Sequence, residues 1–283
     1  MTRIAFLGTG LLGGALAEAA AKRGGDDITV WNRTTGKGRA LEQFGIRVAP
    51  EPADAVRGAD RVHVVLKDDA AVETVIAAAR SGLGPRAIVV DHTTTQPALT
   101  AARARRLNAE GVRYLHCPVF IGPAAARKGQ GTIMVSGPRE LFDEVHDALA
   151  RMAERVEYCG ERPDQAAVLK LCGNAFIIGI ASLVSDVLSI AAGAGVAPEE
   201  AMKVIELFNP AASIAGRGRN MIARNFTPSF ELAMARKDVR LMMETAGTHP
   251  LSALPSLAAR MDALIADGHA HDDLAIIGKD ATP

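Results

Sequence analysis

One lysine and one asparagine have the types and the spacing that proton transfer to a substrate requires. Lys170 and Asn174 are four residues apart, so they share one face if this stretch is helical. The segment that follows, 175–192, is almost entirely apolar and contains no proline. A lysine buried there loses hydration, which lowers the pKa of its amine toward neutrality. We expect Lys170 to act as general acid and base while Asn174 holds a substrate oxygen; the alternative is a lysine that reaches solvent from the first helical turns.

The stretch from 164 to about 192 is the element that must position these two side chains. A helix that is apolar on nearly every face belongs inside a protein or in a membrane. Too few residues separate Lys170 from Asp186 to cross the hydrocarbon of a bilayer, which takes about 20. We therefore expect a long, buried central helix and no membrane partner.

A glycine-rich motif near the amino terminus predicts a second function. The strand-like run 3–8 leads into Gly8-Thr9-Gly10-Leu11-Leu12-Gly13, and a helix-forming segment follows. In this strand-turn-helix context, the first glycine permits a tight turn, the second lets a pyrophosphate approach the backbone, and the third lets helix and strand pack closely. The free N–H groups of the helix then bind the phosphates. The motif predicts a dinucleotide site, against the alternative of a glycine turn without a ligand.

The end of the next strand, 28–31, indicates which dinucleotide binds. An NAD site has an acid there for the ribose 2′-hydroxyl, whereas an NADP site has cationic and hydroxyl groups. Here the sequence has Asn32, Arg33 and Thr34, followed by Lys37. Arg33 can pair with a 2′-phosphate and lie against the adenine, Thr34 can donate a hydrogen bond, and Lys37 adds charge. The pattern predicts NADP(H), unless these residues are only a solvated charged run.

Strands and helices continue to alternate, with further strands at 61–66, 87–90, 113–116 and 132–136. This alternation predicts a mostly parallel sheet with ligands at the carboxyl ends of its strands. The loop Leu66-Lys67-Asp68 should therefore face the cofactor. His63 lies inside a strand and is expected to be structural, whereas His92 and His116 lie near the expected crevice.

After residue 164 the strand signal disappears, and helices are predicted at about 198–208, 213–224, 229–246 and 251–267. The fold class is therefore α/β: a Rossmann dinucleotide-binding domain over 1–163, followed by an all-α domain over 164–283. A long central helix joins the two. The helical half is too apolar to stand alone, which predicts a homodimer or a larger homo-oligomer.

Composition excludes several functions. Lys plus Arg and Asp plus Glu are 32 each and aromatic residues are 4%, so no basic surface for nucleic acid is expected. Cys117, Cys159 and Cys172 have neither metal-binding spacing nor a disulfide framework, and we expect no metal. Position 1 leads directly into a strand, which leaves no room for a signal peptide and predicts a cytoplasmic protein.

At this point the sequence resembles the β-hydroxyacid dehydrogenase family, which includes 3-hydroxyisobutyrate dehydrogenase and tartronate semialdehyde reductase. The resemblance covers essentially the whole chain and includes a carboxyl-terminal domain like that of 6-phosphogluconate dehydrogenase. It implies that Lys170 is the catalytic lysine, that Asn174 helps to place the substrate, and that Thr94 and Lys237 contact the cofactor near its nicotinamide. Four motifs carry it, at Phe6–Gly13, Asp91–Pro97, Lys170–Asn174 and Phe230–Asp238.

One segment departs from the family pattern. The family sequence Asp-Ala-Pro-Val-Ser-Gly-Gly, whose serine and first glycine bind the substrate carboxylate, reads His116-Cys117-Pro118-Val119-Phe120-Ile121-Gly122 here. Phe120 has no hydroxyl, and Ile121 adds bulk where close backbone approach is needed. We expect Thr94, Phe120, Ile121 and Gly122 to line a substrate pocket that is more apolar than in the family's enzymes for short hydroxyacids.

The sequence thus predicts an NADP(H)-dependent oxidoreductase that transfers hydride between the nicotinamide and a small carbonyl or alcohol substrate of 3-hydroxyacid or semialdehyde type. One alternative is an imine reductase on the same fold, which the apolar Phe120 and Ile121 favour. By resemblance, however, imine reductases usually carry Asp or Tyr at the position of Lys170. Another alternative is a non-catalytic NADP-binding sensor or scaffold, which the presence of Lys170 disfavours.

Overall fold

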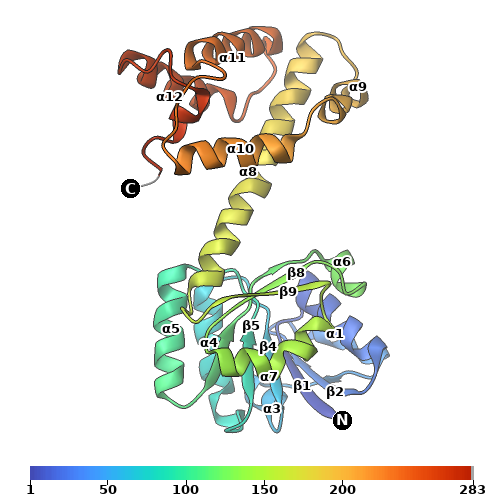
Figure 1. Cartoon of the computed structure of the whole chain (residues 1–283). Helices are drawn as coiled ribbons and strands as arrows, with labels where there is room; N and C mark the ends of the chain where they lie inside the picture. Colours follow the sequence, from blue (N-terminus) through green and yellow to red (C-terminus); the bar gives the residue numbers. More distant parts are fainter. Residues whose placement is uncertain (282–283) are drawn as a thin grey trace. The chain divides into compact units, whose positions relative to one another are not determined.

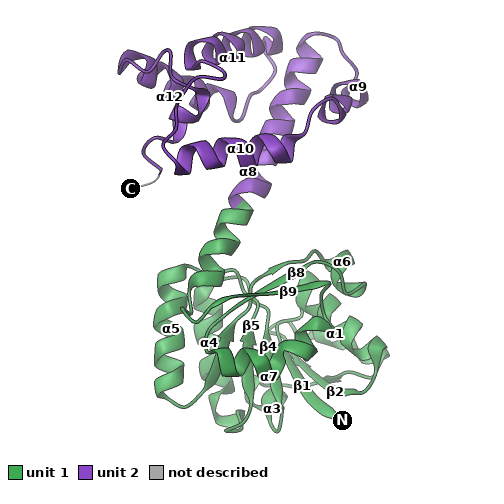
Figure 2. Ribbon diagram, viewed as in Figure 1, with its two compact units in different colours: residues 1–174 green, residues 175–283 purple. Residues whose placement is uncertain are grey.

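The computed structural model describes residues 1–281, which form two compact units. The first unit ends at Asn174 and the second begins at Ala175, as the colours of Figure 2 show. This division falls inside helix α8 (Gln165–Gly193), whereas the sequence suggests a boundary at 163/164, where that helix begins.

A nine-stranded sheet forms the first unit, with the order β3-β2-β1-β4-β5-β6-β8-β7 and β9 paired with β8. Pairing is parallel from β3 to β6, and β8 runs antiparallel to β6 and β7. All six strands predicted from the sequence are present, while the two-residue β3 and β7 and the partly exposed β9 were not anticipated. The strands are β1 Thr2–Leu7, β2 Asp26–Trp31, β3 Arg47–Val48, β4 Arg61–Val64, β5 Ile88–Asp91, β6 Arg113–His116, β7 Val119–Phe120, β8 Thr132–Ser136 and β9 Arg155–Gly160.

Helices cover both faces of this sheet (Figure 1). Successive side chains of a strand point to opposite faces, so Phe6 packs into one apolar cluster with α1 and α7 while Leu7 packs into another with α4 and α5. This double burial explains why the strands read as continuous apolar runs. The helices are α1 Leu11–Arg23, α2 Thr35–Arg39, α3 Pro52–Val56, α4 Asp69–Ala79, α5 Pro97–Ala109, α6 Pro123–Arg127 and α7 Arg139–Ala150, with 3₁₀ turns η1 Glu42–Phe44 and η2 Arg80–Gly82.

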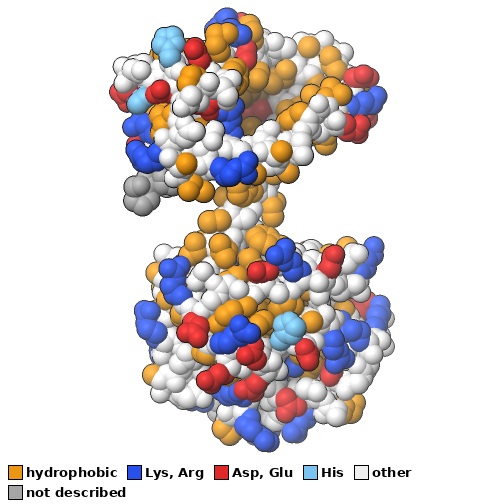
Figure 3. All heavy atoms as spheres, viewed as in Figure 1, with side chains coloured by type: hydrophobic (Ala, Val, Ile, Leu, Met, Phe, Trp, Pro, Cys, Tyr) orange, Lys and Arg blue, Asp and Glu red, His pale blue; other side chains and the backbone are white. Residues whose placement is uncertain are grey.

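Helix α8 begins in the first unit, where Ser136 fastens its first turn. The Ser136 hydroxyl donates to the carbonyl of Pro163 (2.8 Å) and accepts the N–H of Ala166 (3.2 Å). The prediction of a long helix is confirmed, but the prediction that it is buried is wrong for the single chain. Phe176 and Ile178 are 56% and 69% exposed, and Figure 3 shows hydrophobic side chains on the open surface of this helix. Apolar composition indicates that a surface needs covering, and it does not indicate which molecule covers it.

By length and composition alone, α8 would also qualify as a membrane span. This is weak evidence for a membrane-spanning helix, because the core helices of soluble proteins meet the same criteria. The helix carries a buried carboxylate, Asp186, which accepts hydrogen bonds from three backbone N–H groups at the start of α12 (Leu254–Ala266): those of Ser252, Ala253 and Leu254. In the second unit, α8 is therefore tied to its neighbours by a helix cap.

The described part of the second unit is helical, as the sequence predicts. Its core lies between α11 and α12 and includes Leu232, Val239, Met261 and Leu264. A second buried carboxylate, Asp273, accepts hydrogen bonds from the backbone around it and pairs with Arg217. Besides α8 and α12, the helical elements are α9 Pro198–Met202, α10 Pro210–Ile222, α11 Leu232–Ala246, and the 3₁₀ turns η3 Lys203–Glu206 and η4 Leu274–Gly278.

Candidate functional site

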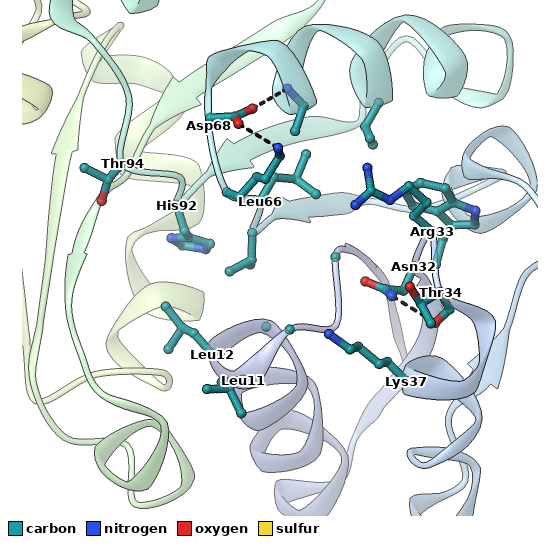
Figure 4. Close-up of a pocket in the computed structure, with 18 of the residues that line it drawn as sticks. Leu11, Leu12, Asn32, Arg33, Thr34, Lys37, Leu66, Asp68, His92 and Thr94 are labelled. Atoms are coloured by element: carbon teal, nitrogen blue, oxygen red, sulfur yellow. Dashed lines mark hydrogen bonds and ion pairs between the residues drawn. The ribbon is translucent and has the colours of Figure 1, made fainter.

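A cavity of about 780 Å³ lies in the first unit, where the carboxyl ends of β1, β2, β4 and β5 meet (Figure 4). Its size is that of a ligand site, and its position is where doubly wound sheets bind ligands. Fifteen residues predicted from the sequence line it: Gly8, Gly10, Leu11, Leu12, Gly13, Asn32, Arg33, Thr34, Lys37, Leu66, Lys67, Asp68, Thr94, Ile121 and Lys170.

The three glycines of the motif have different roles in the structure. Gly8 has a φ of +102°, and a side chain there would come within 2.2 Å of the carbonyl oxygen of Val65. A Cβ at Gly13 would lie 2.1 Å from the carbonyl oxygen of Gly8, so helix α1 could not pack so closely on the turn. A Cβ at Gly10 would meet nothing within 4 Å. Gly10 thus leaves open the space into which a ligand would fit, while the other two glycines are required by packing.

The first turn of α1 is suited to a pyrophosphate. Gly10 is its N-cap residue, so no side chain caps the helix, and no acidic residue lies in the first turn. The N–H groups of that turn and the helix dipole therefore favour a bound anion. The sequence predicts that Thr9 contacts the cofactor, but Thr9 does not line the cavity. Its N–H donates to the side chain of Asn32 (3.0 Å), and its hydroxyl is buried without a partner among residues 1–281.

Asn32 holds two cofactor loops together. Its Oδ1 accepts the N–H of Thr9 and its Nδ2 donates to the carbonyl of Thr34 (2.9 Å). Beyond it, the exposed Arg33 and Lys37 extend into the same end of the cavity (Figure 4). Neither cation forms an ion pair in the part of the chain that the structure describes, although the charge of Arg33 helps to lower the pKa of the Asp68 carboxyl. Two unpaired cations fit a doubly negative ligand group such as a phosphate.

The opposite wall comes from the loop after β4 and the first turns of α4. Asp68 caps α4 by accepting the N–H of Ala71 (2.8 Å), and it pairs with Lys67 (3.1 Å). These two interactions hold the pKa of the Asp68 carboxyl below its ordinary value. Sequence reasoning missed most of this wall, because no motif distinguishes small residues of an ordinary helix. The missed lining residues are Val65, Ala70, Ala71, Thr74 and Val75 in this wall, and Trp31 and Val119 outside it.

His92 lines the cavity at the end of β5 and belongs to a chain of buried hydrogen bonds. The Arg61 side chain donates to Nε2 of His63 (3.0 Å), His63 Nδ1 contacts His92 Nε2 (2.8 Å), and His92 Nδ1 contacts the carbonyl oxygen of Cys117 (2.8 Å). Burial lowers the pKa of His92 to about 4 and that of His63 well below its ordinary value. Both imidazoles are therefore neutral, and each donates through Nδ1. This series of hydrogen bonds holds the Cys117 carbonyl in place, three residues before Phe120.

Lys170 lies in the second turn of α8 with only 8% of its surface exposed, and it lines the same cavity. Its Nζ lies 4.0 Å from the centre of the Phe120 ring, and it forms no ion pair or hydrogen bond within residues 1–281. Burial lowers the pKa of the amine. The same ring lies against Gly173, where an added Cβ would be 2.2 Å from Phe120 Cζ. Such an amine can exchange a proton with a bound substrate.

Other predicted site residues do not line the cavity, among them Phe120, whose ring instead contacts the cavity residue Lys170. Asn174, one turn after Lys170, is partly exposed and does not line it. Gly122 is exposed at the start of α6. His116 is fully buried away from the cavity, its ring without a partner among the described residues, and burial lowers its pKa to about 3. Lys237 lies on α11 in the second unit, so its contact with the cofactor stays a prediction.

Comparison with known proteins covers nearly the whole chain. Residues 3–160 match the family model for the NAD binding domain of 6-phosphogluconate dehydrogenase, and residues 165–279 match the model described as "NAD-binding of NADP-dependent 3-hydroxyisobutyrate dehydrogenase". An uncharacterized oxidoreductase of Shewanella frigidimarina is 30% identical over 90% of each chain. Glyoxylate/succinic semialdehyde reductase 1 of Arabidopsis thaliana is 26% identical over 92% of this chain and 90% of its own.

Solved structures give the same fold. An imine reductase from Myxococcus stipitatus in complex with NADP+ matches with a TM-score of 0.88 and 21% identity, over 97% of this chain and 98% of that one. At this identity the likeness concerns the fold alone. The sequence-based prediction of an α/β domain followed by a helical domain is confirmed.

Proposed function

Because the chain belongs to the family of the 3-hydroxyisobutyrate dehydrogenases, we propose that it is an NADP(H)-dependent oxidoreductase that interconverts a small carbonyl compound and the corresponding alcohol. One observation carries the proposal. The cavity that holds the glycine loop also contains the buried amine of Lys170, which has no ion-pair partner within residues 1–281.

Lys170 supplies the proton in this reaction. The nicotinamide, when bound, provides the hydride that reduces the carbonyl carbon. The Lys170 ammonium donates a proton to the carbonyl oxygen as that oxygen gains negative charge, and solvent then returns a proton to the neutral amine. In the oxidation direction, the neutral amine accepts the hydroxyl proton. Because burial lowers the pKa of Lys170, its ammonium gives up a proton more readily than that of an exposed lysine, and such transfer typically contributes about 10²–10⁴-fold to the rate.

The preference for NADP(H) over NAD(H) rests on Arg33 and Lys37. Both are unpaired within the described part of the chain and lie at the cavity end beyond β2. Thr34 can add a hydroxyl donor, and no carboxylate occupies position 32 to repel a 2′-phosphate. The free first turn of α1 and the open space beside Gly10 fit the pyrophosphate.

Replacing Lys170 by alanine tests the proposal. We expect Lys170→Ala to lower kcat by about 10²–10⁴-fold while the Kd for NADPH stays unchanged, because the amine acts on the substrate oxygen. The matched control is Lys128→Ala, which removes an exposed lysine that does not line the cavity. Turnover that persists in Lys170→Ala would remove this residue from the mechanism.

A second candidate reaction is imine reduction on the same fold. The apolar ring of Phe120 beside Lys170 favours it, because that ring offers no hydrogen bond to a carboxylate substrate. NADPH consumption measured with cyclic imines, uncharged aldehydes and oxoacids in parallel separates the two reactions. Turnover of imines alone would replace the carbonyl proposal with this one.

We also propose that a second copy of the chain covers α8. Its exposed apolar side chains in the second unit include Phe176, Ile177, Ile178, Ile180 and Leu183, a surface that monomers rarely leave open. Light scattering coupled to size exclusion should give at least a dimer, and Ile178→Glu should dissociate it by burying a charge at the interface. A monomer in the wild type would contradict this part of the proposal.

A further inference from the structure

We propose that Phe120 and Gly173 form a matched pair that makes the site select uncharged, apolar carbonyl substrates over substrates that carry a carboxylate. The inference rests on the proposed function, because it names the substrate class on which that reaction acts. It concerns residues of the first unit only, where Phe120, Lys170 and Gly173 are all placed.

The two residues fit together sterically. The Phe120 ring occupies the space in front of Gly173, where a Cβ would lie 2.2, 2.8 and 3.1 Å from three of the ring carbons. Any other residue at 173 would have to push the ring away. Because Gly173 lies on α8 only three residues after Lys170, the ring is held directly beside the lysine, with Nζ 4.0 Å from its centre.

Position 120 is held in place from the other side as well. The buried His63–His92 pair binds the carbonyl of Cys117, so the segment leading to Phe120 cannot drift freely. Phe120 itself ends the short strand β7, which pairs with β8 and places Phe120 opposite Thr132. The backbone at position 120 is therefore held from both sides, and the ring contacts Lys170, which lines the cavity.

The chemistry of the Phe120 ring disfavours a carboxylate beside Lys170. The face of an aromatic ring carries partial negative charge, which attracts the ammonium and repels an anion. Arg33 and Lys37, the unpaired cations of the cavity, lie at its other end, away from His92 and Thr94 (Figure 4). Lys170 is the cation in contact with the Phe120 ring, so a substrate carboxylate there would pair with Lys170. That pairing would occupy the amine that must protonate the carbonyl oxygen.

An apolar substituent meets no such conflict. It can pack against the partly buried Ile121, which lines the cavity, and against the Phe120 ring beside Lys170. Removing such a group from water stabilises binding, while the carbonyl oxygen stays free to receive the proton from Lys170. The site therefore distinguishes two substrates that share a reacting carbonyl and differ only in charge.

The test compares an aldehyde acid with its methyl ester, which have the same chain and the same aldehyde. We expect the wild type to reduce the ester with kcat/KM at least about tenfold above that of the acid. Phe120→Ser should shift this ratio toward the acid by about tenfold or more, because it restores a hydroxyl and removes the ring. Phe120→Leu, which keeps an apolar side chain without a hydroxyl, should retain the preference for the ester.

Gly173→Ala tests the pair from the other side, because the new methyl group displaces the ring. It should reduce the ester preference, whereas Cys172→Ala, at the neighbouring exposed position of α8, should leave the ratio as in the wild type. NADPH affinity, measured by fluorescence, confirms that each variant is folded.

Two results separate the inference from the proposed function. A wild-type enzyme that reduces the acid as well as the ester, or a Phe120→Ser variant with an unchanged ratio, would overturn the inference and leave the proposed function intact. A wild type that binds NADPH and reduces neither compound, nor any other carbonyl, would overturn both.

Discussion

Replacing Arg33 by alanine should weaken the binding of NADPH far more than that of NADH. Arg33 lines the cavity at the end of β2, is exposed, and has no ion-pair partner within residues 1–281. Its guanidinium is thus free to bind a phosphate, and removing it leaves no internal charge unpaired. The variant should fold like the wild type, so a change in affinity reports the lost contact with the ligand.

The expected magnitude follows from the kind of contact. A hydrogen bond to a charged group contributes about 1.5–3 kcal/mol. At about 1.4 kcal/mol for each factor of ten, the Kd for NADPH should rise about 10–100-fold. NADH lacks the 2′-phosphate and should lose only the contact of the guanidinium with the adenine, about 0.5–1 kcal/mol at an exposed site, or a few-fold. Added salt should weaken NADPH binding less in Arg33→Ala than in the wild type, because one screened charge is gone.

The protein contains its own probe for this experiment. Trp31 is the one tryptophan of the sequence and lines the same cavity, so energy transfer from it to the reduced nicotinamide reports binding of both cofactors. Arg39→Ala is the matched control, because Arg39 is exposed at the end of the short helix α2, which follows the loop of Arg33, and does not line the cavity. Equal losses for NADPH and NADH would refute the assignment of the 2′-phosphate to this end of the cavity.

Three further results are expected. First, kcat/KM for reduction should fall as pH rises through the pKa of Lys170. Because burial lowers that pKa, the fall should begin below the ordinary lysine value of about 10.4. If kcat/KM stays constant up to that pH, Lys170 is not a desolvated proton donor. Second, Gly13→Ala should lower the free energy of unfolding by about 1–3 kcal/mol and weaken NADPH binding, because its methyl group would meet the Gly8 carbonyl. The control Gly14→Ala, whose Cβ would lie 3.6 Å from the nearest atom, should be neutral or stabilising. Urea denaturation measures both. Third, Asp273→Asn should cost about 3–5 kcal/mol at neutral pH. Burial alone would raise the pKa of Asp273, but hydrogen bonds from the backbone and Ser229 outweigh it and lower the pKa, so the stabilisation is present above the unfolded pKa of about 3.9 and is lost as pH falls through the folded value. The loss in Asp273→Asn should therefore shrink in acid, and exposed Asp267→Asn should show neither effect.

Local patterns predicted the parts of the site that a short segment specifies. The glycine motif places its three glycines in a strand-turn-helix context, and the structure assigns Gly8, Gly10 and Gly13 the roles that this context implies. The continuous apolar runs likewise predicted the central strands, because strands that are buried on both faces leave no alternation to misread. Lys170 was predicted as a site residue because a cation is conspicuous at the start of an apolar helix.

Contacts between distant segments were beyond such patterns. Phe120 stood out as a departure from a family motif, yet nothing in the sequence says that its ring rests on Gly173 and Lys170, some fifty residues later. The hydrogen bond between His63 and His92 depends on the register of β4 beside β5. The exposure of α8 was missed for a related reason: the composition of a helix shows that its surface is apolar, but not which part of the protein or which partner buries it. Each of these features depends on tertiary arrangement.

The dual role of Asn32 restricts how the nucleotide preference can be redesigned. Because one amide bridges the phosphate-binding turn to the segment that carries the two cations, the shape of each loop depends on the other. Introducing an aspartate at this position, the obvious way to favour the unphosphorylated coenzyme, would preserve the acceptor for Thr9 but abolish the donor to Thr34. Engineering should therefore leave Asn32 intact and alter the charges beyond it, where a substitution changes selectivity without loosening the scaffold.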